Sequence, residues 1–148
     1  MDQMFERKII DLLDHHRLMT FATNRPDGWP QATTVGYVND GLTLYFLCGP
    51  DSQKAHNLAR DNRVSLTIDY DVPDPMAITG LSMAPHAYRV TDPAEVAKAM
   101  QLLGQRYPEY ASFPMPKPED IRVFRVEPKM TSVLDYSKGF GHTDLVAV

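Results

Sequence analysis

Three apolar segments separated by two short turn sequences constrain the fold of this chain most strongly. Residues 18–24, 31–38 and 42–48 read LMTFATN, QATTVGYV and LTLYFLC, and are rich in β-branched and aromatic residues. Between them lie RPDGWP and NDG, whose Pro, Asp, Asn and Gly residues are typical of tight turns. Strands joined by such short turns pair with their neighbours, so the segments predict an antiparallel meander.

The rest of the chain adds helices and further strands to this meander. Six or seven strands with few helices favour a closed or nearly closed antiparallel barrel, with a β-sandwich as the alternative. Gly80 and Pro85 indicate bends or a bulge within residues 76–92. Pro128 cannot donate a hydrogen bond to a central strand, so residues 121–136 form either a strand pair or one bent strand. We expect helices over residues 2–17, within 51–62 and over 93–107, and strands over 63–69, 76–92 and 121–136.

Length and composition limit the class of protein. A chain of 148 residues suits one domain, which we expect to span residues 1–148. The net charge of −4 argues against a protein built to bind nucleic acid. Cys48 is the single cysteine, which excludes an internal disulfide and a thiolate metal cluster, and the five histidines lack metal-ligand spacing. No apolar run has the length of a membrane span, so we expect a cytoplasmic protein with no membrane partner.

A short helix within DSQKAHNLARDN interrupts the β-pattern and places a lysine in its first turn. Ser52 suits the N-cap position, where its side chain and the free backbone N–H groups of the helix can bind an anion. Lys54 lies at the end of the helix where the macrodipole disfavours a cation, and a bound anion would explain this placement. The alternative is that Ser52 only caps the helix and Lys54 is a solvated surface charge.

The order of these motifs resembles the flavin-binding split-barrel family that includes pyridoxamine phosphate oxidase. The shared pattern is a strand FAT, the turn RPDG, the strands QATTVGYV and LYF, and then S-K--NL-R-NRVSLTI. It covers roughly residues 5–92 and returns over VFRVEP and LDYSKGFGH. The resemblance implies a mainly β (α+β) fold, a six-stranded antiparallel split barrel with flanking helices. It also implies a homodimer that holds FMN between its two subunits.

The resemblance further implies three cofactor-binding segments. The strand ATTVGY would lie beside the flavin ring, the end of strand 42–48 would border the ring and ribityl chain, and the first turn of the helix would hold the phosphate. The residues concerned are Thr33, Thr34, Val35, Gly36, Phe46, Leu47, Cys48, Ser52 and Lys54. No side chain stands out as a catalytic acid or base, which is compatible with direct hydride transfer at the flavin.

These expectations define a function and its alternatives. We expect an FMN-dependent oxidoreductase that acts on an unidentified small molecule with a small-molecule electron donor. The alternatives are a non-catalytic flavin-binding or stress-response module, and the same barrel binding a deazaflavin or haem. Vitamin-B6 oxidase activity is not expected, because the C-terminal Arg-X-His-X-Arg element of that enzyme has no counterpart around His142, where Asp144 stands in place of a cation.

Overall fold

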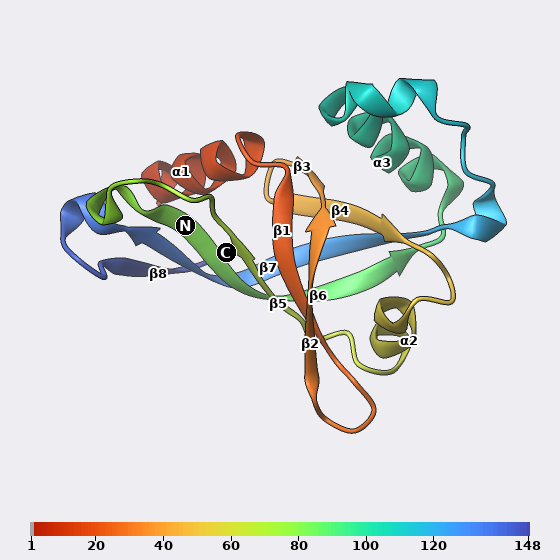
Figure 1. Ribbon diagram of the computed structural model, residues 1–148, viewed down its shortest axis with the longest axis horizontal. Coiled ribbons are helices and arrows are strands. Elements are labelled where there is room, and N and C mark those ends of the chain that lie inside the picture. Colours follow the sequence, from red (N-terminus) through yellow and green to blue (C-terminus); the bar gives the residue numbers. More distant parts are fainter. Residues whose placement is uncertain (1) are drawn as a thin grey trace.

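One antiparallel sheet, bent around a hydrophobic core, forms the body of the molecule in the computed structural model, which describes residues 2–148 (Figure 1). Its strands follow the order β2-β1-β5-β6-β7-β4-β3, and β8 pairs with β7. The strands are β1 (Leu18–Asn24), β2 (Pro30–Gly36), β3 (Val38–Asp40), β4 (Thr43–Cys48), β5 (Ser65–Ile68), β6 (Thr79–Val90), β7 (Arg122–Asp135) and β8 (Thr143–Ala147). The helices are α1 (Gln3–Asp14), α2 (Gln53–Arg60) and α3 (Pro93–Arg106).

The curvature of the sheet follows from its order. Strands β2 and β3 stand at opposite ends of the sheet, yet Tyr37 alone separates them in the chain. The sheet must therefore curl until its two ends meet at Tyr37. Counting β2 and β3 as one run, six strands within residues 2–148 form the curled sheet and β8 extends it. This arrangement confirms the predicted antiparallel split barrel, and the alternative of two packed sheets is wrong.

Tyr37 is held where the ends of the sheet meet. Its backbone N–H donates to the carbonyl of Arg17 at 3.1 Å, and its buried hydroxyl donates to the carbonyl of Leu13 at 2.7 Å. The buried hydroxyl of Tyr107, just after α3, lies 3.1 Å from the Tyr37 nitrogen and also donates to the carbonyl of Arg17. A Cβ on Gly36 would stand 2.9 Å from the same hydroxyl, so the position requires glycine. The sequence prediction of one unbroken strand over 31–38 is wrong, because the backbone turns here toward a second partner strand.

The two prolines of the long strands lie together at a bulge. Strand β6 pairs with β7 from Thr79 to Val90, with a register shift between Ala84 and His86 that leaves out Pro85. On β7, the same shift leaves out Pro128. Strand β7 pairs with β4 up to residue 126 and with β8 from residue 130 onward. Pro128 lies between these two regions, so its missing N–H costs the sheet no hydrogen bond. The segment 121–136 is thus one bent strand, one of the two possibilities that the sequence left open.

Strand β8 is the element that sequence reasoning missed. It pairs with β7 from Met130 to Leu134 and follows the short 3-10 helix Tyr136–Lys138. Its burial alternates only weakly, and Val146 is the one member counted among the buried residues. A five-residue strand with a single buried side chain carries little periodic signal, which explains the omission.

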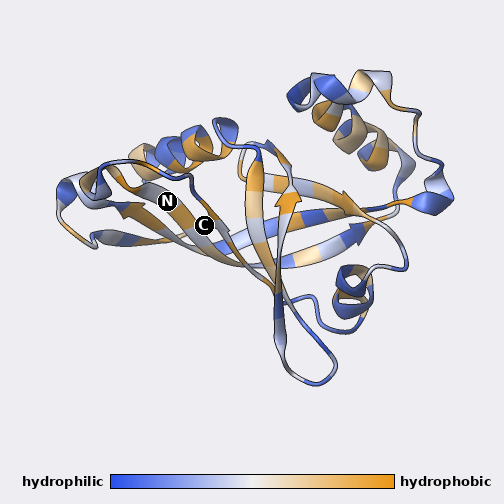
Figure 2. Ribbon diagram, viewed as in Figure 1, coloured by the Kyte–Doolittle hydropathy of each residue, from blue (hydrophilic) through white to orange (hydrophobic). Residues whose placement is uncertain are grey.

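The helices cover different parts of the sheet (Figures 1 and 2). Helix α1 buries Ile9 and Leu13 in the larger core cluster, where Phe46 stacks between Phe21 and Phe124 at centroid distances of 4.7 and 5.3 Å. Helix α3 builds a second cluster on the other face of β4. Its members are Val38, Tyr45, Val90, Ala99, Leu103, Tyr107 and Val123. Within residues 2–148, no helix combines the length and apolarity needed to cross a membrane.

The role of Tyr107 can be tested by removing its hydroxyl. We expect Tyr107→Phe to lower the free energy of unfolding by about 1–3 kcal/mol, because buried backbone groups of Arg17 and Tyr37 lose a partner. Urea unfolding followed by circular dichroism measures the change. Tyr110→Phe is the matched control, since that exposed ring stacks on Tyr107. Equal stability of the two variants would contradict this account of sheet closure.

Candidate functional site

Helix α2 begins with the cap that the sequence predicts. The Ser52 hydroxyl accepts from the N–H of Ala55 at 3.2 Å and donates to the carbonyl of Gly49 at 2.8 Å. At the other face of the helix, the buried side chain of Asn57 donates to Thr23 at 2.9 Å and to Gln31 at 3.3 Å. These contacts fix α2 against β1 and β2, so the start of the helix has a defined position relative to the sheet.

Lys54 is a half-buried cation without a carboxylate partner. Its Nζ lies 5.9 Å from the centre of the Phe46 ring, and no ion pair within residues 2–148 involves it. Burial lowers the pKa of the ammonium group, while the neighbouring Cys48 thiol raises it. Lys54 is therefore not a fully solvated surface charge, and its role in binding an anion stays a prediction.

Arg122 adds a second cation, which sequence reasoning did not place in the site. It is the partner of Cys48 in the β4–β7 ladder, and its Nε is buried without a hydrogen-bond partner among residues 2–148. Burial raises the pKa of the Cys48 thiol, and the nearby Ser52 hydroxyl and the charges of Lys54 and Arg122 oppose that rise. Three of the predicted residues, Cys48, Ser52 and Lys54, therefore meet around one point. The pairing of β4 with β7 brings in Arg122, and no local motif reveals that pairing.

Alternation along β4 separates the remaining predicted residues of this strand. Phe46 and Cys48 contact the larger core cluster on the side of Lys54, whereas Leu47 packs into the second cluster beneath α3. The side chain of Leu47 thus lies on the opposite face of the strand from Cys48.

The four predicted residues of β2 also divide between two faces. Thr33 and Val35 share the face of Gln31, which contacts α2, and Thr34 is exposed on the other face with Gly36. The Thr33 hydroxyl is buried without a partner within the described chain. A Cβ at Gly36 would meet the Tyr107 hydroxyl, so this side chain is one reason for a glycine here, and the predicted flavin contact at Gly36 stays a prediction.

The described residues fit a phosphorylated cofactor at the start of α2. Free N–H groups of the first turn, the Lys54 ammonium and the Arg122 guanidinium are the donors that bind a phosphate. The unpartnered Arg122 Nε and Thr33 hydroxyl are buried polar atoms that a bound polar group would satisfy. We call Ser52, Lys54 and Arg122, with Cys48 between them, the cationic cradle.

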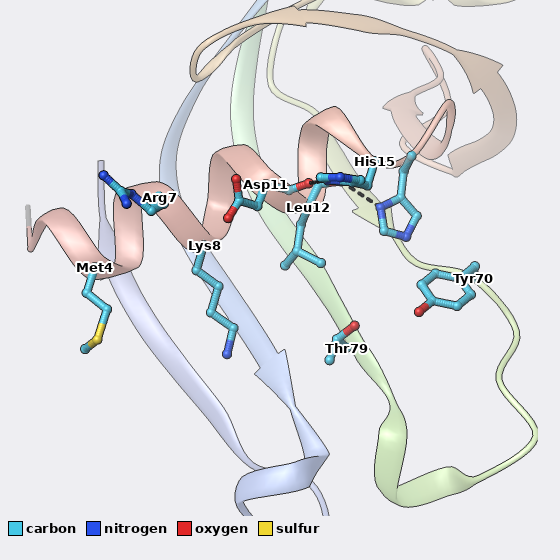
Figure 3. A pocket seen from close by; sticks show the side chains of 9 residues that line it. Met4, Arg7, Lys8, Asp11, Leu12, His15, Tyr70 and Thr79 are labelled. Carbon is cyan, nitrogen blue, oxygen red and sulfur yellow. Dashed lines mark hydrogen bonds between the residues drawn. The ribbon is translucent and has the colours of Figure 1, made fainter.

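A groove of about 580 Å³ along α1 is a separate feature (Figure 3). None of the nine predicted residues lines it. Its Lys8 is paired with Asp135, and the Nδ1 atoms of His15 and His16 each bond a helix carbonyl at 2.6 Å. Lys8, His15 and His16 are thus held by the protein, while the His16 Nε2 atom is buried without a partner among residues 2–148, and we assign the groove no ligand.

The C-terminal segment bears on the substrate. His142 and Lys138 both lie close to Asp144, at 3.1 and 3.5 Å. The hydrogen bond with His142 is the largest cause that lowers the pKa of Asp144, and the charge of Lys138 adds to it. A carboxylate therefore engages the histidine and the lysine of this segment, and they are poorly placed to bind a substrate phosphate.

Comparison with known proteins identifies the family. A family model described as pyridoxamine 5'-phosphate oxidase matches residues 5–134. The chain belongs to the pyridoxamine 5'-phosphate oxidase-like split-barrel family. Over 69 residues it is 30% identical to General stress protein 26 of Bacillus subtilis (strain 168). That match covers 47% of this chain and 49% of the relative, so it spans about half the length of that protein.

Two solved structures of the same fold are named for their ligands. A heme-binding protein from Mycobacterium smegmatis has a TM-score of 0.77 and 22% identity, over 96% of this chain and 56% of that one. A FAD-binding protein from Mesorhizobium loti has a TM-score of 0.69 and 17% identity, over 86% of this chain and 91% of that one. A protein named for heme binding and one named for FAD binding therefore share this fold.

Proposed function

We propose that this member of the family binds FMN through the cationic cradle and acts as an FMN-dependent oxidoreductase. The observation that carries the proposal is the pair of unpartnered cations, Lys54 and Arg122, beside the capped start of α2. Half-buried cations without counter-ions are costly, and a bound dianion would offset that cost.

The two ends of FMN would make different contacts. The phosphate would lie at Ser52, Lys54 and Arg122. The lysine and arginine side chains only donate hydrogen bonds, and the serine hydroxyl can donate one. The flavin ring would lie along β2, where the exposed Thr34 and neighbouring backbone groups are available for contact. Bound FMN supplies the hydride chemistry, so the chain's own task is to hold the ring and to shape access for a small-molecule electron donor and substrate.

The name of General stress protein 26 fits one alternative, a non-catalytic flavin-binding or stress-response module. Reduction by NADPH or NADH, followed by repeated turnover with an electron acceptor, separates the two. If the protein is an enzyme, we propose a substrate other than pyridoxamine phosphate, because Asp144 engages both His142 and Lys138.

The phosphate contacts predict a preference that a titration can measure. We expect FMN to bind more tightly than riboflavin, as followed by quenching of flavin fluorescence. Lys54→Ala and Arg122→Ala should each weaken FMN by about 10- to 150-fold, the range for losing a hydrogen bond between charged groups, and should leave riboflavin binding nearly unchanged. Lys129→Ala is the control, an exposed lysine on β7 outside the cradle. Equal affinity for both flavins would refute the phosphate site.

We further propose that the chain is a homodimer. Large apolar side chains remain exposed on the β1–β2 hairpin and on β8, including Leu18 at 56%, Trp29 at 71% and Leu145 at 68%. Large apolar side chains left exposed in this way are candidates for burial against a second copy of the chain.

The dimer has a direct test. Light scattering at micromolar concentration should give twice the 16.7 kDa mass of the chain. If FMN contacts both subunits, added FMN should also stabilise the dimer against dilution, because the ligand favours the state that binds it. A monomeric mass for FMN-loaded protein would overturn the proposal.

A further inference from the structure

Arg89, near the end of β6, lies on the same face of the sheet as the cationic cradle. Arg89 pairs with Phe124 of β7, and Phe124 in turn pairs with Phe46 of β4. Directly paired side chains of neighbouring strands share a face, and so do side chains two positions apart along one strand. Arg122 therefore also lies on this face, opposite Cys48, and Figure 1 shows β4, β7 and β6 as neighbours.

Arg89 and Arg122 are diagonal neighbours on this face. The partner of Arg89 stands two positions after Arg122 in β7, and such diagonal pairs lie about 7–8 Å apart, within the reach of long side chains. Both arginines also border one hollow of about 350 Å³ where β6 ends and β7 begins. Lys54 lies further along, over the Phe46 ring. Three cations thus follow one another from the start of α2 across β7 to β6.

None of these three cations has a carboxylate partner among residues 2–148. Arg125, on the other face of β7, differs from them, because it contacts Glu95 at 2.8 Å and Glu127 at 2.7 Å. The carboxylate of Asp92, the nearest to Arg89 in the sequence, accepts from the N–H of Glu95 and so caps α3. Neighbouring like charges repel, so an anion that lies between them stabilises the group.

The order of the strands indicates what such an anion is attached to. The flavin ring is proposed to lie along β2, and its phosphate at the start of α2. Strand β2 meets the sheet beside β3, on one side of β4, whereas β7 and then β6 follow on the other side. Arg89 is therefore reached from the phosphate by moving away from the ring. In a flavin dinucleotide, the group on that side of the first phosphate is a second phosphate.

We propose that Arg89 extends the cationic cradle to a second phosphate, so that the site takes the diphosphate of FAD as well as the monophosphate of FMN. Arg122 serves both phosphates, because it lies between Lys54 and Arg89. Arg89 serves the second phosphate alone, and its planar guanidinium can donate two hydrogen bonds to it. This role rests on the proposed flavin site, and it makes Arg89 a specificity-determining residue.

Titration calorimetry with FMN and FAD tests this role. FAD should bind the unsubstituted chain at least as tightly as FMN. Arg89→Ala should weaken FAD by about 10- to 150-fold, the range for losing a hydrogen bond between charged groups, and leave FMN nearly unchanged. Arg89→Lys should restore part of the FAD affinity, because it keeps the charge but loses the planar fork. Because the Arg89 side chain is exposed, neither substitution should alter the fold.

Arg7→Ala is the matched control, because it removes an exposed arginine from α1 and should change the affinity of neither flavin. Weaker binding of FAD than of FMN to the unsubstituted chain, unchanged FAD binding in Arg89→Ala, or an equal loss for both flavins would overturn the role of Arg89. If neither flavin binds, the proposed function fails, and inorganic pyrophosphate and phosphate take the place of the flavins. Arg89→Ala should then weaken pyrophosphate more than phosphate, and an equal effect on the two anions would refute the second-phosphate contact.

Discussion

The hydrogen bonds at Tyr37 hold the two ends of the sheet together, and the site depends on that closure. Tyr37 lies between β2 and β3, and the Tyr107 hydroxyl and the Arg17 carbonyl fix its backbone. With the ends joined, β3 runs beside β4 and β4 runs beside β7. That pairing sets Cys48 opposite Arg122, and α2 follows directly after β4 with Lys54 over Phe46. A flat sheet of the same strands would leave its edges β2 and β3 far apart.

The end of β4 serves two different environments because successive side chains of a strand point to opposite faces. Phe46 and Cys48 face the cationic cradle, and Leu47 faces the second core cluster beneath α3. Arg122, at the start of the neighbouring β7, pairs with Cys48 and so shares the cradle side.

Short sequence patterns correctly predicted the turns and the helix cap, which depend on contacts between residues close in the sequence. The turns RPDGWP and NDG and the Ser52 cap are each made by residues within a few positions of one another, and the structure confirms them. The break at Tyr37 and the role of Arg122 depend on strands distant in the sequence, so no local pattern carries them. Gly36 shows the same limit, because the side chain that a Cβ there would meet belongs to a tyrosine 71 positions later in the sequence. The cofactor contacts themselves stay predictions, supported by the burial and the unpaired charges of Lys54 and Arg122.

The most direct test of the account is to identify what the protein carries when it is purified without added cofactor. Absorption spectroscopy of the intact protein, followed by mass analysis of the ligand released on denaturation, distinguishes the candidates. The account predicts the absorption bands of an oxidised flavin and the mass of FMN, or full loading when FMN is added to ligand-free protein. A Soret band, the mass of haem or a deazaflavin, or failure to bind added FMN would contradict it.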